Sequence, residues 1–299
     1  AEPRIQWIGE VTRPTDLDMP VPFISRIGNF LTGGDRGRER LVRPFGVGVD
    51  ETGNLCVTDT GAGAVSFYDL ARHQYRRWTE VGGQRFDFPV AVAKHQGLIY
   101  VADSGRQEVV VFTEQGRVQW RIREDADRPS GLALGSDRLY VACANTHVIR
   151  VYDLHGRALF QFGRRGVLPG EFNFPTHLAV DGTGLIYVTD ALNSRVQVFD
   201  REGRFQREIG SLGDGSGHFS RPKGVAVGAS GEVFVSDVLF DNVQIFDREG
   251  RFLMDFGSAG SLRGECWMPA GLAVAPDGRI YLADSYNGRL QIFQPLRTP

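Results

Sequence analysis

Short runs of β-branched and aromatic residues recur along the whole chain, and turns rich in Gly and Asp separate them. Residues 185–190 read LIYVTD and residues 195–199 read RVQVF, a composition typical of buried strands. Between such runs lie turns such as residues 181–184 and 200–203, in which Asp can accept backbone N–H groups and Gly can adopt positive φ. Helical periodicity of any length is absent, so the sequence predicts an all-β protein.

The same succession of strands and turns occurs six times, and each copy opens at a proline. An apolar first strand is followed by a second strand that ends in Asp or Cys, and then by a third and, in most copies, a fourth strand. The opening prolines lie 45, 40, 46, 47 and 47 residues apart and are Pro44, Pro89, Pro129, Pro175, Pro222 and Pro269. Four antiparallel strands in a repeat of this length are typical of a propeller blade. The sequence therefore predicts a six-bladed β-propeller.

The sixth copy lacks an outer strand of its own, since only six residues follow Phe293. Residues 23–28 (FISRIG) resemble the outer-strand sequences REIG and MDFG of other copies. We therefore predict that Phe23–Gly28 completes the last blade, because joining the two chain ends removes open sheet edges. This divides the chain into an N-terminal arm, residues 1–22, and one propeller domain, residues 23–299. Residues 4–9 (RIQWIG) are an alternative closing strand.

Composition excludes few functions. The chain has 34 basic and 36 acidic residues and a formal net charge of −2, so no overall positive field favours nucleic acid. No apolar run approaches the roughly 18 residues that a membrane helix needs. The three cysteines form neither a CxxC motif nor an even set, which argues against a disulfide framework, a zinc ribbon or covalent haem attachment. We predict no cofactor.

The repeats resemble the NHL family, whose pattern is Pro-x-Gly-x-Ala-Val, then Gly-x-Ile-Tyr-Val-x-Asp, then Asn-x-Arg-Val-Gln-Val-Phe. Residues 175–199 match it best, with Asn193, Arg195 and Gln197 in place. The resemblance covers about nine-tenths of the chain and extends to exported bacterial NHL proteins, some of which accompany multihaem cytochromes. It implies a periplasmic or extracellular protein with its signal peptide removed, and a cytochrome as one candidate partner.

Strand direction predicts which loops share a face. The proline loops and the loops after the second strands lie on one rim, which we call the proline-loop rim, and turns such as DREG lie on the other. NHL propellers typically bind partners on the first rim. Its variable side chains mix aromatic residues with Arg and His, as protein interfaces do. The candidate partner-binding residues are Phe45, Arg106, His147, His177, Lys223, Leu239, Phe240, Trp267 and Tyr286.

One acidic position recurs at the end of the second strand in five copies: Asp59, Asp103, Asp190, Asp237 and Asp284. A ring of carboxylates could bind calcium or act in catalysis. Recurrence at one strand end favours a structural role instead, in which each aspartate accepts backbone N–H groups of the following turn. The third copy has Cys143 there, with His147 in the next loop. Two explanations remain for this departure: sequence drift in a degenerate blade, or a special site formed by Cys143 and His147.

Recognisable enzyme motifs are absent. NHL-type amidating lyases carry zinc on histidines directly after blade-opening prolines, and those positions here are Phe45, Val90, Ser130, Thr176, Lys223 and Ala270. His177 is one place further on and stands alone, whereas a catalytic zinc usually has three protein ligands. The sequence therefore predicts a non-enzymatic scaffold or accessory subunit that binds a protein or peptide. The alternatives are a metal-dependent hydrolase or lyase with its site in the central channel, and an RNA-binding NHL domain.

Overall fold

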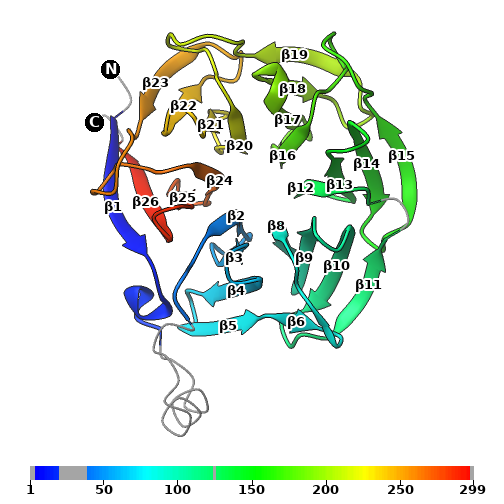
Figure 1. The fold of residues 1–299 in the computed structure, drawn as a ribbon, viewed down its shortest axis with the longest axis vertical. Helices are drawn as coiled ribbons and strands as arrows, with labels where there is room; N and C mark the ends of the chain where they lie inside the picture. Colours follow the sequence, from blue (N-terminus) through cyan, green and yellow to red (C-terminus); the bar gives the residue numbers. More distant parts are fainter. Residues whose placement is uncertain (1–3, 20–38, 124–125, 297–299) are drawn as a thin grey trace, which may run out of the picture.

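Six four-stranded antiparallel sheets surround a central axis (Figure 1). The structure is a computed structural model that describes residues 4–19, 39–123 and 126–296. In each sheet the strand nearest the axis opens at one of the six prolines, and the following strands lie progressively further out. This confirms the six-bladed β-propeller with four antiparallel strands per blade. Among the described residues, no helix has the length and apolar character needed to cross a membrane.

The first three blades are continuous in sequence. Blade one contains β2 (Pro44–Val49), β3 (Leu55–Asp59), β4 (Ala64–Asp69) and β5 (Gln74–Trp78). A small hairpin follows, made of β6 (Glu80–Val81) and β7 (Gln84–Arg85). Blade two contains β8 (Pro89–His95), β9 (Leu98–Asp103), β10 (Glu108–Thr113) and β11 (Val118–Ile122). Blade three contains β12 (Pro129–Leu134), β13 (Arg138–Cys143), β14 (Val148–Asp153) and β15 (Ala158–Phe162).

The last three blades follow the same order, except that the sixth takes its outer strand from the other end of the chain. Blade four contains β16 (Pro175–Val180), β17 (Ile186–Asp190), β18 (Arg195–Phe199) and β19 (Phe205–Ile209). Blade five contains β20 (Pro222–Val227), β21 (Val233–Asp237), β22 (Asn242–Phe246) and β23 (Phe252–Phe256). Blade six contains β24 (Pro269–Val274), β25 (Ile280–Asp284), β26 (Arg289–Leu296) and β1 (Arg4–Val11). Two short 3₁₀ turns, η1 (Pro14–Leu17) and η2 (Ala191–Asn193), complete the elements.

Local sequence explains both the strands and the turns. Every residue of β17 is buried because neighbouring blades cover both faces of the middle strands, whereas burial alternates along the outer strand β19. The turn between β18 and β19 is fixed by Asp200, whose Oδ1 accepts the N–H groups of Glu202 at 3.0 Å and Arg204 at 2.9 Å. Gly203 follows at φ 79°, a conformation that glycine adopts without strain. The repeated Asp and Gly therefore set the blade period.

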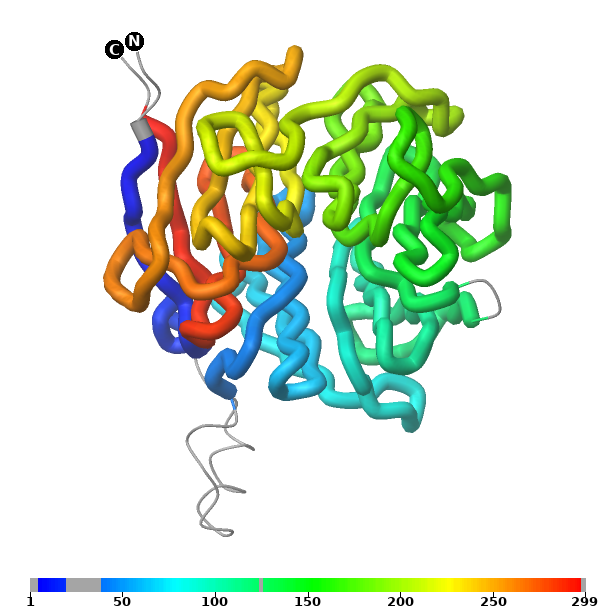
Figure 2. Tube along the Cα trace, turned by 45° about the horizontal axis from the view of Figure 1, so that its top comes forward, coloured from blue at the N-terminus to red at the C-terminus, as the bar shows by residue number. Residues whose placement is uncertain are grey.

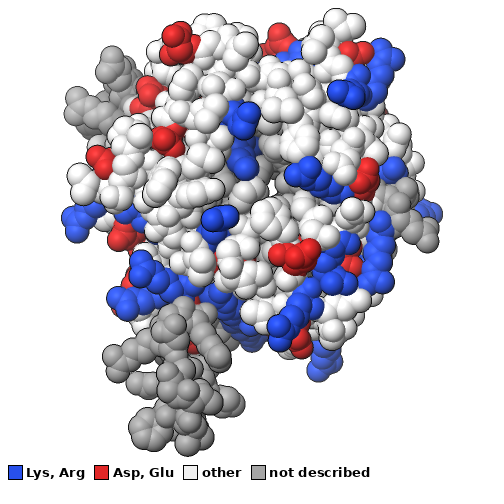
Figure 3. All heavy atoms as spheres, viewed as in Figure 1, with Lys and Arg blue, Asp and Glu red and all other residues white. Residues whose placement is uncertain are grey.

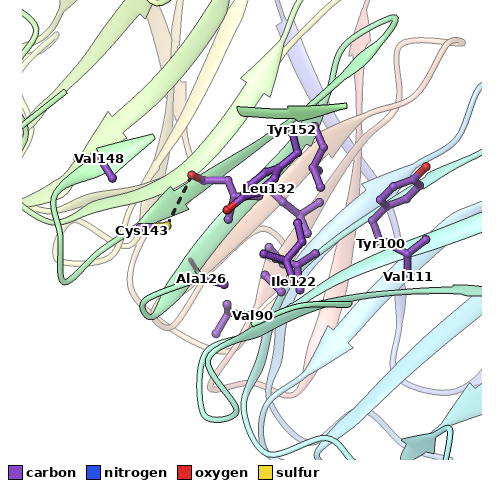
Figure 4. Packing of buried hydrophobic residues seen from close by; sticks show 14 residues of the cluster. Val90, Tyr100, Val111, Ile122, Ala126, Leu132, Cys143, Val148 and Tyr152 are labelled. Carbon is purple, nitrogen blue, oxygen red and sulfur yellow. Dashed lines mark hydrogen bonds between the residues drawn. The ribbon is translucent and has the colours of Figure 1, made fainter. Parts of the chain in front are cut away.

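The hydrophobic core is divided among the junctions between blades. In the described part of the chain, each cluster of buried hydrophobic residues joins two neighbouring blades. Figure 4 shows the cluster between blades two and three, to which Val90 and Tyr100 of blade two and Leu132 and Tyr152 of blade three belong. The aromatic residue at the centre of each second strand is buried in five blades: Tyr100, Tyr140, Tyr187, Phe234 and Tyr281. The ring is therefore held together by blade-to-blade packing.

The ring closes through the pairing of β1 with β26. The two strands run antiparallel from Arg4 opposite Leu296 to Val11 opposite Leu290, and Arg289 pairs with Glu10 at 2.8 Å. The described chain ends lie side by side at one edge of the ring (Figure 2). Residues 4–11 therefore belong to the propeller and not to an arm.

This pairing corrects the closing strand that the sequence predicts. The segment Phe23–Gly28 lies outside the described residues, and the place beside β26 is taken by the alternative strand near the N-terminus. Both segments have outer-strand character, so local pattern does not distinguish them. The β1–β26 pairing places Val11 in the buried cluster with Leu290 and Ile292, which favours this register over a shift of one residue.

Deletion of residues 1–11 should leave β26 as an open edge with apolar neighbours on its faces. We expect a lower melting temperature than that of the full chain, together with soluble oligomers in size-exclusion chromatography. Deletion of residues 1–3 alone is the control, since β1 begins at Arg4. A monomer with an unchanged melting temperature after deletion of residues 1–11 would show that β1 does not seal the ring.

Candidate functional site

Figure 1 looks down the axis onto the proline-loop rim, and connections between blades such as that from β23 to β24 cross in front of the sheets. This rim carries the loops that enter each first strand and those that leave each second strand. The turns between first and second strands, and between third and fourth strands, lie at the opposite rim. The proline-loop rim is therefore built from the longer and more variable connections.

The five recurrent aspartates are fully buried. Asp237 accepts N–H groups of Ser220 and Arg221 before the proline, at 2.7 and 2.9 Å, and of Leu239 in the following turn, at 2.9 Å. Asp59 accepts the N–H groups of Val42, Arg43 and Ala62, and Asp103 those of Asp87, Phe88, Gly105 and Arg106. Each carboxylate thus ties the loop before a blade to the turn after its second strand, and these hydrogen bonds occupy its oxygens.

Blades four and six add charged and amide side chains to this arrangement. Asp284 accepts the N–H of Trp267 at 2.8 Å and pairs with Arg289 at 2.7 Å, and Gln291 donates to it at 3.0 Å. Arg289 also donates to the carbonyls of Leu262 and Glu265 in the loop that enters the blade. Asp190, Arg195 and Gln197 repeat the pattern in blade four. The NHL-type Arg and Gln therefore hold the inter-blade loops in place.

Cys143 and His147 each have separate contacts. Cys143 is buried in the cluster between blades two and three, with its Sγ 4.0 Å from the Val141 carbonyl oxygen (Figure 4). His147 Nδ1 accepts the N–H of Phe174 at 3.1 Å. Asp241, the equivalent residue of blade five, accepts the N–H of Met268 at 2.7 Å in the same way. His147 therefore does for the next proline loop what Asp241 does two blades later.

The predicted rim residues do not form one site. Two of them lie apart from the others, four lie in the loops of blades five and six, and three meet at the axis. Arg106 is exposed and lies 3.3 Å from Glu108 in blade two, and His147 is bound as above. Leu239, Phe240, Trp267 and Tyr286 belong to the loops of blades five and six. Phe45, His177 and Lys223 come from the first strands of blades one, four and five and meet at the axis.

The loops of blades five, six and one form an exposed aromatic arc, which we define as Leu239, Trp267, Tyr286, Arg43 and Val42. The Trp267 and Tyr286 rings lie 5.5 Å apart, and the Arg43 guanidinium lies 4.8 Å above the Tyr286 ring. Trp267 is 55% exposed and Tyr286 47% exposed. Sequence reasoning missed Val42 and Arg43; the signal available was their position directly before an opening proline.

Large hydrophobic side chains are exposed unevenly. Apart from three on outer strands (Ile8, Leu159 and Leu253) and Leu296 at the end of β26, those exposed in the described chain lie on the proline-loop rim: Val42, Phe88, Val167, Leu168, Leu192, Leu212, Leu239, Leu262, Trp267 and Tyr286. Figure 3 shows this rim with broad areas free of charged side chains, interrupted by separate basic and acidic side chains. An apolar face of this kind is what a docking partner covers.

A pocket of about 370 Å³ opens at the axis on the same rim. Phe45 of blade one reaches across to blades four and five. Its ring lies 5.8 Å from that of His177 and 6.4 Å from that of Phe88, and the Lys223 Nζ lies 4.3 Å from its centre. Phe174 and Arg128, missed by sequence reasoning, also line the pocket, and the Arg128 guanidinium lies 4.9 Å above the Phe174 ring. No acidic side chain of the described residues lines it.

Burial changes the titration of His177 and Lys223 in this axial pocket. Burial, and then the charge of Lys223, lower the pKa of His177 to about 3, so its imidazole is neutral at physiological pH. Burial, with a further contribution from Arg221, lowers the pKa of Lys223 to about 8. Lys94, the other lysine, differs because Asp50 lies 2.6 Å and Glu114 3.1 Å from its Nζ, and these contacts outweigh burial and raise its pKa. Lys223 has no such acidic partner among the described residues.

Metal-ligating side chains do not gather anywhere in the described chain: no group of three or more His, Cys, Asp or Glu is placed to hold an ion. At the axis, the positions after the prolines contribute Phe45, Val90, Ser130, Thr176 and Lys223 to the pocket. A larger groove, of about 1210 Å³, lies beside β5 on the outside of the ring. Its Arg76 donates to the Glu114 carbonyl oxygen at 2.7 Å and so joins blades one and two across this groove.

Comparison with known families agrees with the six-fold repeat. Residues 267–293 match the NHL repeat, and residues 182–237 match the family described as 6-bladed beta-propeller. The chain is a six-bladed β-propeller that carries the NHL repeat. The first match covers the whole path of blade six from its proline loop to β26 and includes Trp267 and Tyr286 of the aromatic arc.

Solved structures share the propeller fold at low sequence identity. Virginiamycin B lyase from Staphylococcus aureus is 11% identical over 99% of this chain and 100% of its own, with a TM-score of 0.62. Hydrazine synthase of Kuenenia stuttgartiensis is 14% identical over 89% and 98%, with a TM-score of 0.60. A WD40 β-propeller domain is 15% identical over 84% and 78%, with a TM-score of 0.59. At such identities this chain shares the fold alone with these proteins.

The contacts of Asp284 predict a large effect of its removal. In the Asp284→Ala variant the buried Arg289 keeps Glu10 but loses its buried carboxylate. The Trp267 N–H and Gln291 also lose this acceptor, so we expect the free energy of unfolding to fall by about 3 kcal/mol. Asp277→Ala, in the same blade, removes a half-exposed pair with Arg279 and should cost less than about 1 kcal/mol. Chemical denaturation of both variants measures the difference. Equal destabilisation would mean that Asp284 does not fasten the loop.

Proposed function

We propose that this NHL propeller is a non-enzymatic binding module that docks a protein or peptide partner on its proline-loop rim through the aromatic arc. The observation that carries the proposal is the gathering of exposed apolar side chains on this one rim. Trp, Tyr and Arg are enriched among the residues that contribute most of the binding energy at protein interfaces. Trp267, Tyr286 and Arg43 have this arrangement on loops that buried aspartates hold in place.

Charge favours a partner segment that combines acidic and apolar residues. Arg43 belongs to the arc, and Arg221 lies at its blade-five end, where the Arg221 carbonyl oxygen accepts the N–H of Val238; both arginines are exposed. The neighbouring carboxylates of Asp237, Asp241 and Asp284 accept backbone N–H groups of the loops. The exposed guanidinium groups are therefore the charges that a partner meets beside the rings, and they attract an acidic segment and set its orientation.

The resemblance to exported bacterial NHL proteins supports a wider form of the proposal. In this form the protein works in the periplasm or outside the cell as an accessory subunit, and a multihaem cytochrome is one candidate partner. Cell fractionation followed by immunodetection tests the location. Recovery in the cytoplasmic fraction alone would contradict export.

The lyase similarity does not carry an enzymatic function to this chain, since identity of 11% shows the fold alone. The axial positions hold Phe45, Ser130, Thr176 and Lys223 where a metal-dependent lyase needs ligands. Metal analysis of the natively purified protein separates the two functions. One tightly bound divalent ion per chain would favour the hydrolase or lyase over the binding module.

Substitution of the arc tests the docking surface directly. The full chain, purified under native conditions from its own cells, is expected to bring a protein partner with it. The variant Leu239→Ser, Trp267→Ala, Tyr286→Ala should weaken that partner's affinity by more than about 30-fold, because exposed aromatic anchors contribute about 2 kcal/mol or more. Calorimetry with the purified partner measures the change.

The matched control is the double variant Leu159→Ser, Leu253→Ser. These side chains have exposure near 40%, but they lie on the outer strands β15 and β23. We expect this control to retain the affinity of the unchanged protein, and both variants to keep its melting temperature within a few degrees. Undiminished partner binding by the arc variant would assign the interface to another surface.

A further inference from the structure

His177 departs from the repeat at a position where the fold leaves little space. The second residue after the opening proline is glycine in four blades and alanine in blade two: Gly46, Ala91, Gly131, Gly224 and Gly271. A Cβ on Gly131 would lie 2.1 Å from the Thr176 carbonyl oxygen, and one on Gly224 would lie 2.4 Å from the Ala270 carbonyl oxygen. The first strands of adjacent blades therefore approach closely here, and blade four alone places a large polar side chain at this position.

The His177 imidazole makes no hydrogen bond of normal geometry, although the Lys223 backbone lies near enough to oppose the lowering of its pKa. It is only 8% exposed, and neither Nδ1 nor Nε2 has a partner among the described residues. The nearby Lys223 carbonyl oxygen accepts instead from the Thr176 hydroxyl at 3.1 Å. A buried polar group without a partner is costly, and native proteins rarely keep one without a use for it. The imidazole lines the axial pocket and stacks against Phe45.

Lys223 supplies an uncompensated positive charge beside this imidazole. Its ammonium lies above the Phe45 ring, and no carboxylate of the described residues lies within ion-pair distance of it. The pocket hydroxyls are committed, since Ser130 donates to the Pro175 carbonyl oxygen at 2.7 Å and Thr176 to that of Lys223. The donors left for a ligand inside the pocket are therefore the Lys223 ammonium and the N–H of the neutral His177 ring.

The remaining walls limit the chemistry of the ligand. One buried cation suits a single negative charge, and the rings of Phe45, Phe88 and Phe174 provide apolar surfaces for a flat group. The volume of about 370 Å³ lies at the lower end of small-molecule sites. Arg128, exposed above the Phe174 ring, adds positive charge at the edge of the pocket.

We propose that the axial pocket binds a small organic carboxylate with a flat apolar body, its carboxylate between Lys223 and His177 and its body against Phe45. The carboxylate belongs either to a free small molecule or to the C-terminal residue of a polypeptide. The chemistry of recognition is the same for both.

The first experiment titrates phenylacetate and N-acetyl-L-phenylalanine into the full chain, followed by calorimetry and ligand-observed NMR. We expect saturable binding of at least one of these acids at one site per chain. The neutral analogue phenylacetamide should bind at least about tenfold more weakly, since it lacks the charge that Lys223 recognises. Comparable binding of phenylacetamide would overturn the proposal. So would the absence of saturable binding, at concentrations up to about 10 mM, of both acids and of the peptide acid acetyl-Gly-Gly-Phe.

Single substitutions assign the donors. Lys223→Met keeps an apolar stem of similar length but removes the charge, and should weaken the acid that binds by about tenfold or more. Arg221→Gln, two residues away on the same rim, is the control and should change the affinity by less than about threefold, since an exposed charge contributes little. Unchanged affinity in Lys223→Met would place the carboxylate elsewhere.

The His177→Ala variant separates binding from structure, because Ala91 occupies the equivalent position in blade two. We expect weaker binding by about fivefold or more without a lower melting temperature, since the variant removes a buried polar group that has no partner. A lower melting temperature with undiminished affinity would show that His177 serves packing alone and would overturn its role.

A peptide distinguishes the two sources of the carboxylate. Acetyl-Gly-Gly-Phe and its C-terminal amide are titrated in the same way. Binding of the peptide acid at least about tenfold tighter than N-acetyl-L-phenylalanine, with loss in the amide, identifies a polypeptide C-terminus as the ligand. Equal or weaker binding of the peptide acid identifies a free small molecule.

This proposal stands apart from docking on the aromatic arc. Substitution of Leu239, Trp267 and Tyr286 should leave the affinity for the acid within about twofold, because none of these residues lines the axial pocket. Failure of the pocket and failure of the docking surface are therefore separate observations.

Discussion

The close approach of the first strands around the axis is the constraint on which the rest of the propeller depends. Neighbouring first strands contact one another around the whole ring, from β2 through β24 and back to β2. At Gly46, Gly131, Gly224 and Gly271 a Cβ would lie within 2.6 Å of the backbone of the next blade. This approach fixes the distance between blades and therefore the shape of the buried clusters between them. The other blades have Gly or Ala at this position, so the large polar side chain of His177 is an exception that the close approach does not explain.

The buried aspartates carry this regularity from the sheets to the loops. Because Asp59, Asp103 and Asp237 bind the backbone on both sides of their strand ends, the side chains of those loops are free to vary while the main chain stays in place. Blade three lacks the carboxylate, yet His147 takes the place of Asp241 in holding the next proline loop. The rim can thus present different side chains from six nearly identical supports, which is how one fold serves many partners.

Two kinds of surface lie on this rim and differ physically. The aromatic arc is exposed and open, so only a partner large enough to cover Trp267 and Tyr286 together would remove it from water. The axial pocket is a recess that opens on the rim, and its Lys223 and His177 have lost part of their solvation without gaining an ion pair or a hydrogen bond of normal geometry from the described residues. Burial of apolar area would drive the proposed docking at the first, whereas the ligand proposed for the second would restore interactions to its polar groups.

The local sequence pattern was sufficient to predict the blades. It was insufficient to predict which strand closes the ring and which side chains meet at the site. Strand runs, Asp–Gly turns and opening prolines determined by themselves the number of blades, the order of strands and the rim on which each loop lies, because each depends on residues near one another in sequence. Tertiary structure alone decided that Arg4–Val11 seals β26, that Phe45 crosses the axis to His177, and that Arg43 covers Tyr286. These contacts join residues from different blades, and the directions of their side chains follow from the packing of the closed ring, which no single repeat encodes.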